Sequence, residues 1–290
     1  MSRRTAAFTV VDACLRDGRG GSPTAVVDEP DGAPLTDDER RAVPALAGTS
    51  HAVFLSGGRS APAVRFFTAA GELPACGHGT VAALAYLAER AGGPEHRATL
   101  RAAGHDLVGR TVRAASGHRV ALTTGPVGLR EPTAAELALL LPALGIPADA
   151  LAPGAGVATL GRPRLLVPVA TPSALAALAP AAERLRAACD RLGLLGCYVH
   201  TPPSVAGRVA ARMFAPSIGV PEDIANANST ACLAAHLFTR QGTTRLTVDL
   251  GDALAAPATI ATRARPVPSG LPGPVRVELT ATARVRPGPR

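Results

Sequence analysis

Two segments of the chain are apolar on almost every side of a helix. Residues Gly77–Arg90 read Gly-His-Gly-Thr-Val-Ala-Ala-Leu-Ala-Tyr-Leu-Ala-Glu-Arg, and residues Asn228–Phe238 read Asn-Ser-Thr-Ala-Cys-Leu-Ala-Ala-His-Leu-Phe. A helix on a protein surface carries a polar face, so helices of this kind have to be enclosed by other structure. Each segment also follows a loop of small and polar residues. The chain therefore has to build two enclosures, one around each helix.

Short strand-like runs occur near both apolar helices, and the sheets that they form could enclose the helices. The runs lie at Phe8–Asp12, Thr24–Val27, Ala52–Leu55 and Val64–Phe67 before the first helix, at Leu165–Val169, Cys197–Thr201 and Val209–Phe214 before the second, and at Leu246–Leu250, Thr259–Thr262 and Val275–Val285 near the end of the chain. The same order of elements occurs twice. We therefore predict an α+β fold of two pseudo-symmetric domains, residues 1–128 and 129–290, each a curled mixed β-sheet wrapped around a central apolar helix.

Two capping boxes predict the starts of further helices. Thr36-Asp-Asp-Glu39 opens a helix toward Leu46, and Thr133-Ala-Ala-Glu136 starts a leucine-rich helix. In this pattern the threonine and the glutamate satisfy each other's backbone N–H groups. Helical stretches are also expected around Ala174–Leu178 and Ala181–Leu192.

The chain contains no lysine, and its net charge of +8 comes entirely from arginine. A chain without lysine cannot form a pyridoxal Schiff base, a Walker-type phosphate loop or a lysine general base. Aromatic residues make up only 3% of the chain, and no arginine cluster alternates with stacking side chains. These features argue against nucleic-acid binding.

Cysteine usage argues against both a disulfide framework and a zinc knuckle. The five cysteines are odd in number and widely spaced, and no Cys-x-x-Cys pair occurs; they are Cys14, Cys76, Cys189, Cys197 and Cys232. We expect free thiols. No uncharged apolar run reaches the length of a membrane span, and Met1-Ser-Arg-Arg leads into an alternating stretch rather than a signal peptide, so we expect a cytoplasmic protein with no membrane partner.

The starts of the two apolar helices are suited to binding an anion. The first N–H groups of a helix have no partner within it, and the positive end of the helix dipole favours a carboxylate or a developing enolate. Small residues at Gly77, Gly79, Ala225 and Ala227 would let a ligand approach the backbone. Two such helix starts would clamp a small anionic substrate.

Two long segments carry a family resemblance. Residues Arg65–Thr80, Arg-Phe-Phe-Thr-Ala-Ala-Gly-Glu-Leu-Pro-Ala-Cys-Gly-His-Gly-Thr, resemble the signature of the PhzF-like (phenazine biosynthesis-like) family within the diaminopimelate epimerase superfold. Residues Arg212–Asp223, Arg-Met-Phe-Ala-Pro-Ser-Ile-Gly-Val-Pro-Glu-Asp, resemble its second signature, and Gly21–Val27, Arg164–Pro168 and the stretch around Gly251 are also similar. The resemblance implies an active cleft between two related domains, proton transfer on a small carboxylate-bearing substrate without cofactor or metal, and commonly a homodimer.

The resemblance places His51 where the family has its catalytic base. The family normally carries a Ser-Glu pair there, whereas this chain reads Thr49-Ser50-His51. An imidazole can accept a proton near neutral pH and return it elsewhere on the substrate. The alternative is that loss of the glutamate marks loss of the activity and that His51 is a polar residue at the start of a strand.

Two further positions match acid or base residues of the family. His78 matches the histidine of the first signature, which is expected to hydrogen-bond or protonate the substrate, and Asp223 matches the aspartate of the second. The alternatives are a structural histidine in a buried helix and a turn or cap carboxylate. Glu222 is interpreted as structural.

The chain departs from the family pattern after Asp223. Ile-Ala-Asn-Ala-Asn at 224–228 replaces the usual Pro-x-Thr-Gly-Ser, so amides stand in place of hydroxyl donors. Asn226, Asn228 and Ser229 are candidates for substrate binding together with Cys76, Gly77 and Gly79, although the asparagines would equally serve as helix caps. Racemases of the superfold use two cysteines; Cys76 resembles the first, but no cysteine stands in the loop at Ala225–Ala227, and Cys232 is expected to be a packed thiol.

The sequence therefore predicts a cofactor-independent isomerase that shifts a double bond on a small unsaturated carboxylate, in the specialised, antibiotic-type metabolism in which similar proteins act on pyrroline carboxylates. His51 is the expected base, with Asp223 and His78 as proton donors or orienting groups. The alternatives are a catalytically inactive protein of the same fold that binds a small carboxylate or a protein partner, an amino-acid epimerase or racemase, and a basic nucleic-acid binder.

Overall fold

The protein divides into two compact units. The computed structural model describes residues 7–29, 32, 34–58, 61–147, 150–267 and 275–287. Unit 1 comprises Met1–Thr123 and Thr280–Arg290, and unit 2 comprises Thr124–Leu279. The last strand, β17 (Val275–Val285), begins in unit 2 and ends in unit 1. The domain boundary that the sequence places between residues 128 and 129 stays a prediction.

The described part of unit 1 is built from ten consecutive strands and helices and the end of β17. Its elements are β1 (Thr9–Ala13), β2 (Ser22–Asp28), α1 (Asp37–Ala47), β3 (His51–Ser56), β4 (Ala63–Thr68), β5 (Gly71–Leu73), α2 (Gly77–Ala91), β6 (Glu95–Ala102), β7 (His105–Ala114) and β8 (Gly117–Thr123).

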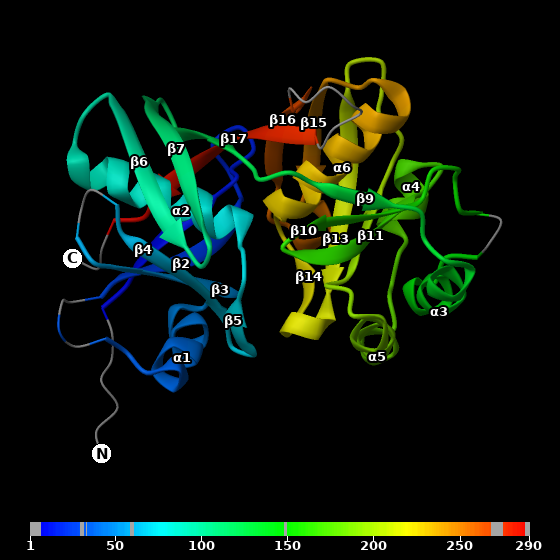
Figure 1. Cartoon of the computed structure of the whole chain (residues 1–290), viewed down its shortest axis with the longest axis horizontal. Helices are drawn as coiled ribbons and strands as arrows, with labels where there is room; N and C mark the ends of the chain where they lie inside the picture. The colour runs from blue at the N-terminus through cyan, green and yellow to red at the C-terminus, as the bar shows by residue number, and fades with distance from the viewer. Residues whose placement is uncertain are drawn as a thin grey trace. The chain divides into compact units, whose positions relative to one another are not determined.

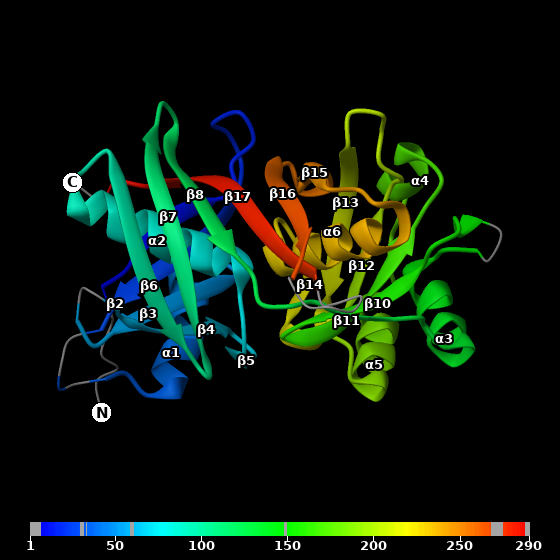
Figure 2. The ribbon, with the colours of Figure 1, turned by 45° about the horizontal axis from the view of Figure 1, so that its top comes forward.

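The strands of unit 1 close into a ring around α2. The pairs β1–β2, β3–β4, β6–β7, β7–β8, β8–β17 and β17–β1 are antiparallel, and β2–β3 and β4–β6 are parallel. Figures 1 and 2 show α2 running through the middle of this ring. A Cβ atom on Gly109 of β7 would lie only 2.2 Å from Cδ1 of Leu84 in α2. The absence of a side chain at this position therefore lets the strand pack directly onto the helix.

Unit 2 contains the second apolar helix and a larger set of outer helices. Its elements are β9 (Gly128–Arg130), α3 (Ala134–Leu144), β10 (Gly156–Leu160), β11 (Arg162–Pro168), α4 (Pro172–Ala176), α5 (Ala182–Leu192), β12 (Cys197–His200), β13 (Arg208–Ala215), η2 (Pro216–Ile218), β14 (Val220–Asp223), α6 (Ala227–Gln241), β15 (Arg245–Leu250), η3 (Asp252–Leu254) and β16 (Ala258–Pro266). Leucines of α3 and α5 pack with strands β10, β11 and β12 in a core cluster that includes Leu140, Leu185 and Phe214.

The order of strand pairings is the same in both units, which confirms the duplicated fold. In unit 1 the pairs β1–β2, β2–β3, β3–β4, β4–β5, β4–β6 and β6–β7 run antiparallel, parallel, antiparallel, antiparallel, parallel and antiparallel. The pairs β10–β11, β11–β12, β12–β13, β13–β14, β13–β15 and β15–β16 of unit 2 repeat this series. Helices α2 and α6 occupy the same place in it, and α6 contacts β10, β15 and β16.

One ion pair is repeated with the fold. Arg65 of β4 donates to both carboxylate oxygens of Glu72 in β5, at 2.7 and 2.6 Å, and Arg212 of β13 donates in the same way to Glu222 in β14, at 2.9 and 2.7 Å. Each pair ties a short strand to its neighbour just before the apolar helix begins. The structural interpretation of Glu222 therefore fits its contacts.

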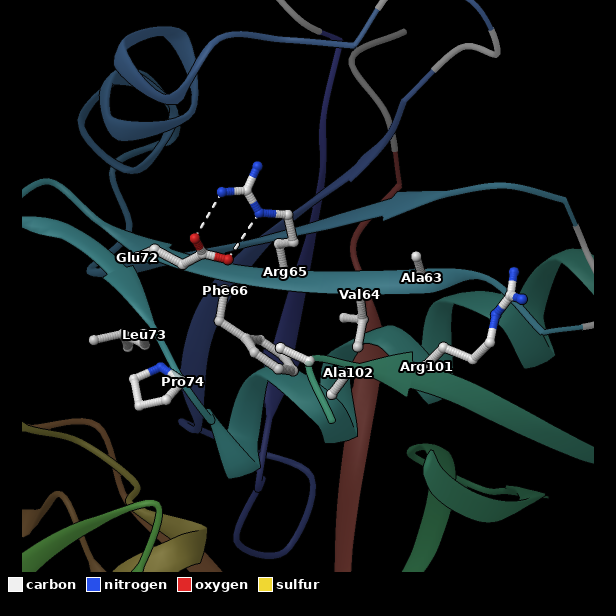
Figure 3. Close-up of a pocket in the computed structure, with 10 residues that line it drawn as sticks. Ala63, Val64, Arg65, Phe66, Glu72, Leu73, Pro74, Arg101 and Ala102 are labelled. Atoms are coloured by element: carbon white, nitrogen blue, oxygen red, sulfur yellow. Dashed lines mark hydrogen bonds and ion pairs between the residues drawn. The ribbon is translucent and has the colours of Figure 1, made fainter. Parts of the chain in front are cut away.

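A hollow of about 590 Å³ lies along β4 and β5 in unit 1, and Arg65, Phe66 and Glu72 are among the residues that line it. Figure 3 shows the ion pair of Arg65 and Glu72 on one side of β4 and the ring of Phe66 on the other, as the alternation of strand side chains requires. Leu73, Pro74 and Ala102 also line the hollow.

Local sequence signals account for several element starts. Thr36 with Glu39 and Thr133 with Glu136 both form complete capping boxes, at the starts of α1 and α3.

All five cysteines are free thiols. No helix in the described part of the chain combines the length and apolar character needed to cross a membrane.

A buried histidine in unit 2 makes stability depend on pH. His200 is 2% exposed, its Nδ1 lies 2.9 Å from the carbonyl oxygen of Thr201, and its Nε2 has no hydrogen-bond partner among the described residues. Burial, with a smaller contribution from the nearby His236, lowers the pKa of His200 from 6.5 to about 4. Between pH 6.5 and pH 4 the imidazole of His200 is protonated in the unfolded chain but neutral in the folded chain. The contribution of His200 to the free energy of unfolding is therefore fully present above pH 6.5 and is lost as the pH falls toward 4.

We expect His200→Asn to reduce the acid sensitivity of the fold. The pKa difference corresponds to about 2 kcal/mol of unfolding free energy lost by the wild type between pH 7 and pH 5. Asparagine keeps a donor toward Thr201 but does not titrate. Urea denaturation of both proteins at pH 7 and pH 5 measures the effect, and an equal loss in wild type and variant would contradict it.

Candidate functional site

Two histidines meet ring to ring inside unit 1. His51 is the first residue of β3 and is 2% exposed, and His78 is the second residue of α2 and is 1% exposed. Their ring centroids are 4.3 Å apart with an interplanar angle of 86°. The hydroxyl oxygen of Ser50 lies 2.8 Å from Nδ1 of His51. Strand β3 and helix α2 thus bring together two of the three predicted catalytic residues.

The surroundings keep the first of these rings uncharged. Burial lowers the pKa of His51 well below its ordinary value, and the neighbouring His78 lowers it further. A charged imidazole loses its hydration in such a place, and a second imidazole nearby adds repulsion when either ring is protonated. His51 is therefore a neutral ring with one nitrogen lone pair at pH 7.

Cys76 completes the cluster in unit 1. It is the N-cap residue of α2 and has an extended backbone, and its side chain makes no capping hydrogen bond to the helix. Its Sγ lies 3.5 Å from Nε2 of His78. One ligating atom from each of His51, Cys76 and His78 lies within 4.8 Å of the others. Neutral imidazole and thiolate are ligands for transition-metal ions such as Zn²⁺. These are the residues that could hold a metal in the described part of the chain.

The first turn of α2 provides the expected anion-binding backbone. Gly77, His78, Gly79 and Thr80 are all buried, and no acidic residue stands in this turn. The N–H groups at the start of a helix have no intrahelical acceptor. Because Gly77 and Gly79 have no side chains, nothing of their own covers the backbone N–H donors that lie beside the two imidazoles.

Gly79 also has a packing role, and we expect Gly79→Ala to disturb the cluster. A Cβ atom at this position would lie 3.0 Å from Sγ of Cys76, 3.0 Å from Cδ1 of Phe66 and 3.1 Å from Cγ2 of Val53. Overpacking of this kind costs about 1–3 kcal/mol. Thermal denaturation should show the loss, while Gly125→Ala, where nothing lies within 4 Å of the added atom, serves as the control. Equal melting temperatures for Gly79→Ala and wild type would contradict the prediction.

The third predicted catalytic residue lies in unit 2. Asp223 is the last residue of β14 and is 3% exposed. The side-chain amide of Asn226 donates from Nδ2 to Oδ2 of Asp223 at 2.9 Å, and its Oδ1 accepts from the backbone N–H of Ser229 at the same distance. Asn226 therefore caps α6 and orients the carboxylate with one side chain.

The other predicted binding residues of unit 2 have different surroundings. Asn228 is half-buried in the first turn of α6, and Ser229 is fully buried with its hydroxyl 3.5 Å from the sulfur of Met213. Cys232 is also fully buried, and a guanidinium nitrogen of Arg164 donates to its Sγ at 2.8 Å. Cys232 is thus the packed thiol that its place in the helix indicated.

The repeated fold relates the two clusters position by position. Cys76 and Asn226 both immediately precede the apolar helix of their unit, and His78 and Asn228 are both its second residue. Phe66 pairs with Leu73 in unit 1, and Met213 pairs with Asp223 in unit 2. The thiol and imidazole of unit 1 therefore correspond to amides in unit 2, while the carboxylate of Asp223 corresponds to an apolar side chain.

Comparison with known proteins identifies the family of the chain. The family model described as phenazine biosynthesis-like protein (PhzC-PhzF) matches residues 11–284. The chain belongs to this family. The match spans both units and therefore includes every residue of the two clusters.

Individual members of the family and of the fold are similar over different shares of the chain. The uncharacterized isomerase YddE of Escherichia coli O157:H7 is 29% identical over 188 residues, and the alignment spans 60% of this chain and 60% of that protein's length. A crystal structure of a Bacillus anthracis phenazine biosynthesis protein of the PhzF family has a TM-score of 0.82 at 17% identity and covers 97% of both chains. A Pseudomonas aeruginosa structure, described as a predicted epimerase, has a TM-score of 0.79 at 27% identity and covers 99% of this chain and 98% of its own. These similarities confirm the predicted fold.

Sequence reasoning missed Ser50 as part of the PhzF-like site. Its hydroxyl is the hydrogen-bond partner of His51 Nδ1, and this contact orients the imidazole ring. The only signal was its place directly before His51, in the segment where the family has its Ser-Glu pair. The sequence also does not show that Asn226 both caps α6 and contacts Asp223, because its residue type fits either role alone.

Proposed function

We propose that this protein is a cofactor-independent isomerase that moves a proton on a small unsaturated carboxylate and thereby shifts a double bond. Support comes from membership of a family whose relatives include proteins named isomerases, and from the paired imidazoles beside a helix N-terminus. The contact between His51 and His78 is the single observation on which the proposal chiefly depends. A pair of neighbouring acid–base groups is what proton removal and return require.

In the first step His51 accepts a proton from a carbon atom of the substrate. The electron pair of the broken C–H bond delocalises over the conjugated system toward the carboxylate. Backbone N–H groups at the start of α2, near Gly77 and Gly79, would stabilise this anion. Ser50 holds the His51 ring in one orientation during the transfer.

In the second step a proton returns to a different carbon of the same anion. His51 itself, His78 or Asp223 would deliver it, and a new C–H bond forms while the double bond takes its new position. If His51 delivers the proton, the substrate regains the one that it lost; if His78 or Asp223 delivers it, the proton held by His51 passes to that group directly or through solvent, so that charge and atoms balance. Asn226 would act on this step by orienting Asp223, and Asn228 and Ser229 complete the proposed substrate-binding set with Cys76.

Deuterium incorporation tests the proposed reaction. The protein is incubated in deuterated water with unsaturated cyclic amino-acid carboxylates, including conjugated pyrroline carboxylates, and the products are analysed by NMR and mass spectrometry. Deuterium at the newly protonated carbon, or direct transfer of the original proton, supports the isomerase. A product formed with neither would contradict the mechanism, and ligand binding without turnover would favour an inactive binding protein.

A two-thiol racemase is disfavoured by a specific feature of unit 2. Asn226, an amide, stands where the repeat would need the partner of Cys76. An amide cannot exchange a proton with a carbon acid at neutral pH. Location in the cytoplasm, a homodimer and a role in specialised metabolism stay predictions.

A further inference from the structure

The cluster in unit 1 contains the donor set of a transition-metal site. His51 and His78 each offer a ring nitrogen and Cys76 offers a sulfur, and all three side chains are buried, with 2%, 1% and 6% exposure. The three atoms lie within 4.8 Å of one another. Imidazole nitrogens and thiolate sulfurs are zinc ligands, and a zinc site with three protein ligands leaves the fourth position open.

The distances are close to those that a zinc ion would impose. With Zn–N of about 2.0–2.1 Å and Zn–S of about 2.3 Å, neighbouring ligands of a tetrahedral site are about 3.3–3.6 Å apart. The observed distance from Cys76 Sγ to His78 Nε2 is 3.5 Å. The remaining separations are at most 4.8 Å and would have to shorten by up to about 1.5 Å, which rotation of the side chains can supply.

The surroundings of the cluster favour fixed ligand positions. Ser50 contacts His51 Nδ1 at 2.8 Å, the kind of outer contact that orients a ligating imidazole and leaves its other nitrogen for the metal. Gly79 packs beneath Cys76, since even a Cβ atom there would lie 3.0 Å from Sγ.

We propose that His51, Cys76 and His78 bind one Zn²⁺ ion per chain. The two rings bind as neutral imidazoles, and Cys76 binds as a thiolate after its thiol proton has passed to solvent. A water molecule or a substrate oxygen takes the open fourth position. Because the ion occupies the ring nitrogens, the zinc-bound protein lacks the free base on which the proposed isomerase depends.

Metal titration of the full-length protein tests the proposal. Protein freed of metal with a chelator is titrated with Zn²⁺ against a chromophoric competitor, and separately with Co²⁺ as a spectroscopic probe. We expect one equivalent of Zn²⁺ to bind and the Co²⁺ protein to show a sulfur-to-cobalt charge-transfer band in the near ultraviolet. Loss of an outer-sphere partner costs about 10- to 100-fold in metal affinity, so we expect this loss for Ser50→Ala and at least this loss for Cys76→Ser.

Two further variants provide the controls. His78→Asn introduces the residue that α6 carries at the matching position, Asn228, and should remove binding; His105→Ala changes an exposed histidine and should leave it unchanged. A cobalt spectrum without a sulfur band in the wild type, or Zn²⁺ affinity unaffected by both Cys76→Ser and His78→Asn, would overturn the proposal.

The metal result is independent of the proposed reaction. Binding is measured without substrate, so failure of the isomerase assay leaves the titration informative. Where turnover is available, one equivalent of Zn²⁺ should abolish it and a chelator should restore it. Zinc binding with undiminished turnover would contradict the base role of His51 rather than the metal site.

Discussion

The variant His51→Gln is expected to lose nearly all turnover while keeping its fold. Glutamine is polar and of similar length but accepts no proton from carbon at neutral pH. Removal of a general base costs about 10²- to 10⁴-fold in rate, so kcat and kcat/KM should fall together by that factor. Because His51 makes its close contacts at Ser50 and His78, the melting temperature serves to separate loss of chemistry from loss of structure.

Two variants define the specificity of this result. His51→Glu restores the residue type that the family resemblance places at this position, and it should be more active than His51→Gln because a carboxylate can again accept the proton. His105→Gln alters an exposed histidine and should turn over like the wild type. Unchanged turnover in His51→Gln would remove the proposed base from the mechanism.

The parts of the fold that could be predicted from the sequence are those governed by local rules. The all-round apolar pattern located α2 and α6, and reciprocal capping located the starts of α1 and α3. Strands β6 and β7 carry many charged residues with only a few buried positions, so their sequence gives no clear strand pattern. Strands β5 and β14 have only three and four residues, too few for an alternating pattern to be recognised.

Long-range pairings could not be predicted in the same way. Strand β17 was expected at its correct bounds, but its pairing with β1 and β8 joins residues from opposite ends of the chain. No local pattern specifies such a partner, because a strand edge offers the same backbone groups to any other strand. The ring around α2 therefore follows from the structure alone.

In the candidate site, too, the sequence predicts individual residues but not the contacts between them. Family signatures indicated His51, His78 and Asp223 individually, but the contact between the two histidine rings depends on how β3 packs against α2. The choice between capping and binding at Asn226 could not be made from residue type, since one amide has both an acceptor and a donor. In the folded chain the acceptor caps the helix and the donor orients Asp223.

The repeat has kept the supporting framework and changed the reactive groups. The Arg–Glu pairs at Arg65 and Arg212 are the same in both units, whereas the positions next to the apolar helices differ. A symmetric two-base enzyme would need equivalent groups in both halves. Unit 1 instead carries imidazoles, and unit 2 carries a carboxylate, so the two halves differ in their acid–base groups.

Asp223→Asn tests whether the two units act on the same substrate molecule. Asparagine keeps an oxygen that can accept from Asn226 Nδ2 but cannot deliver a proton, so kcat should fall by about 10²-fold or more. If Asp223 and His51 serve one reaction, the double variant His51→Gln/Asp223→Asn should lose little beyond the more damaging single change, because residues that act as a unit are not additive. The matched control is Glu222→Gln, which removes a neighbouring carboxylate engaged with Arg212 and should lower the melting temperature without lowering kcat. Full turnover in Asp223→Asn, or independent multiplicative losses in the double variant, would mean that the carboxylate of unit 2 takes no part in the proton transfer begun at His51.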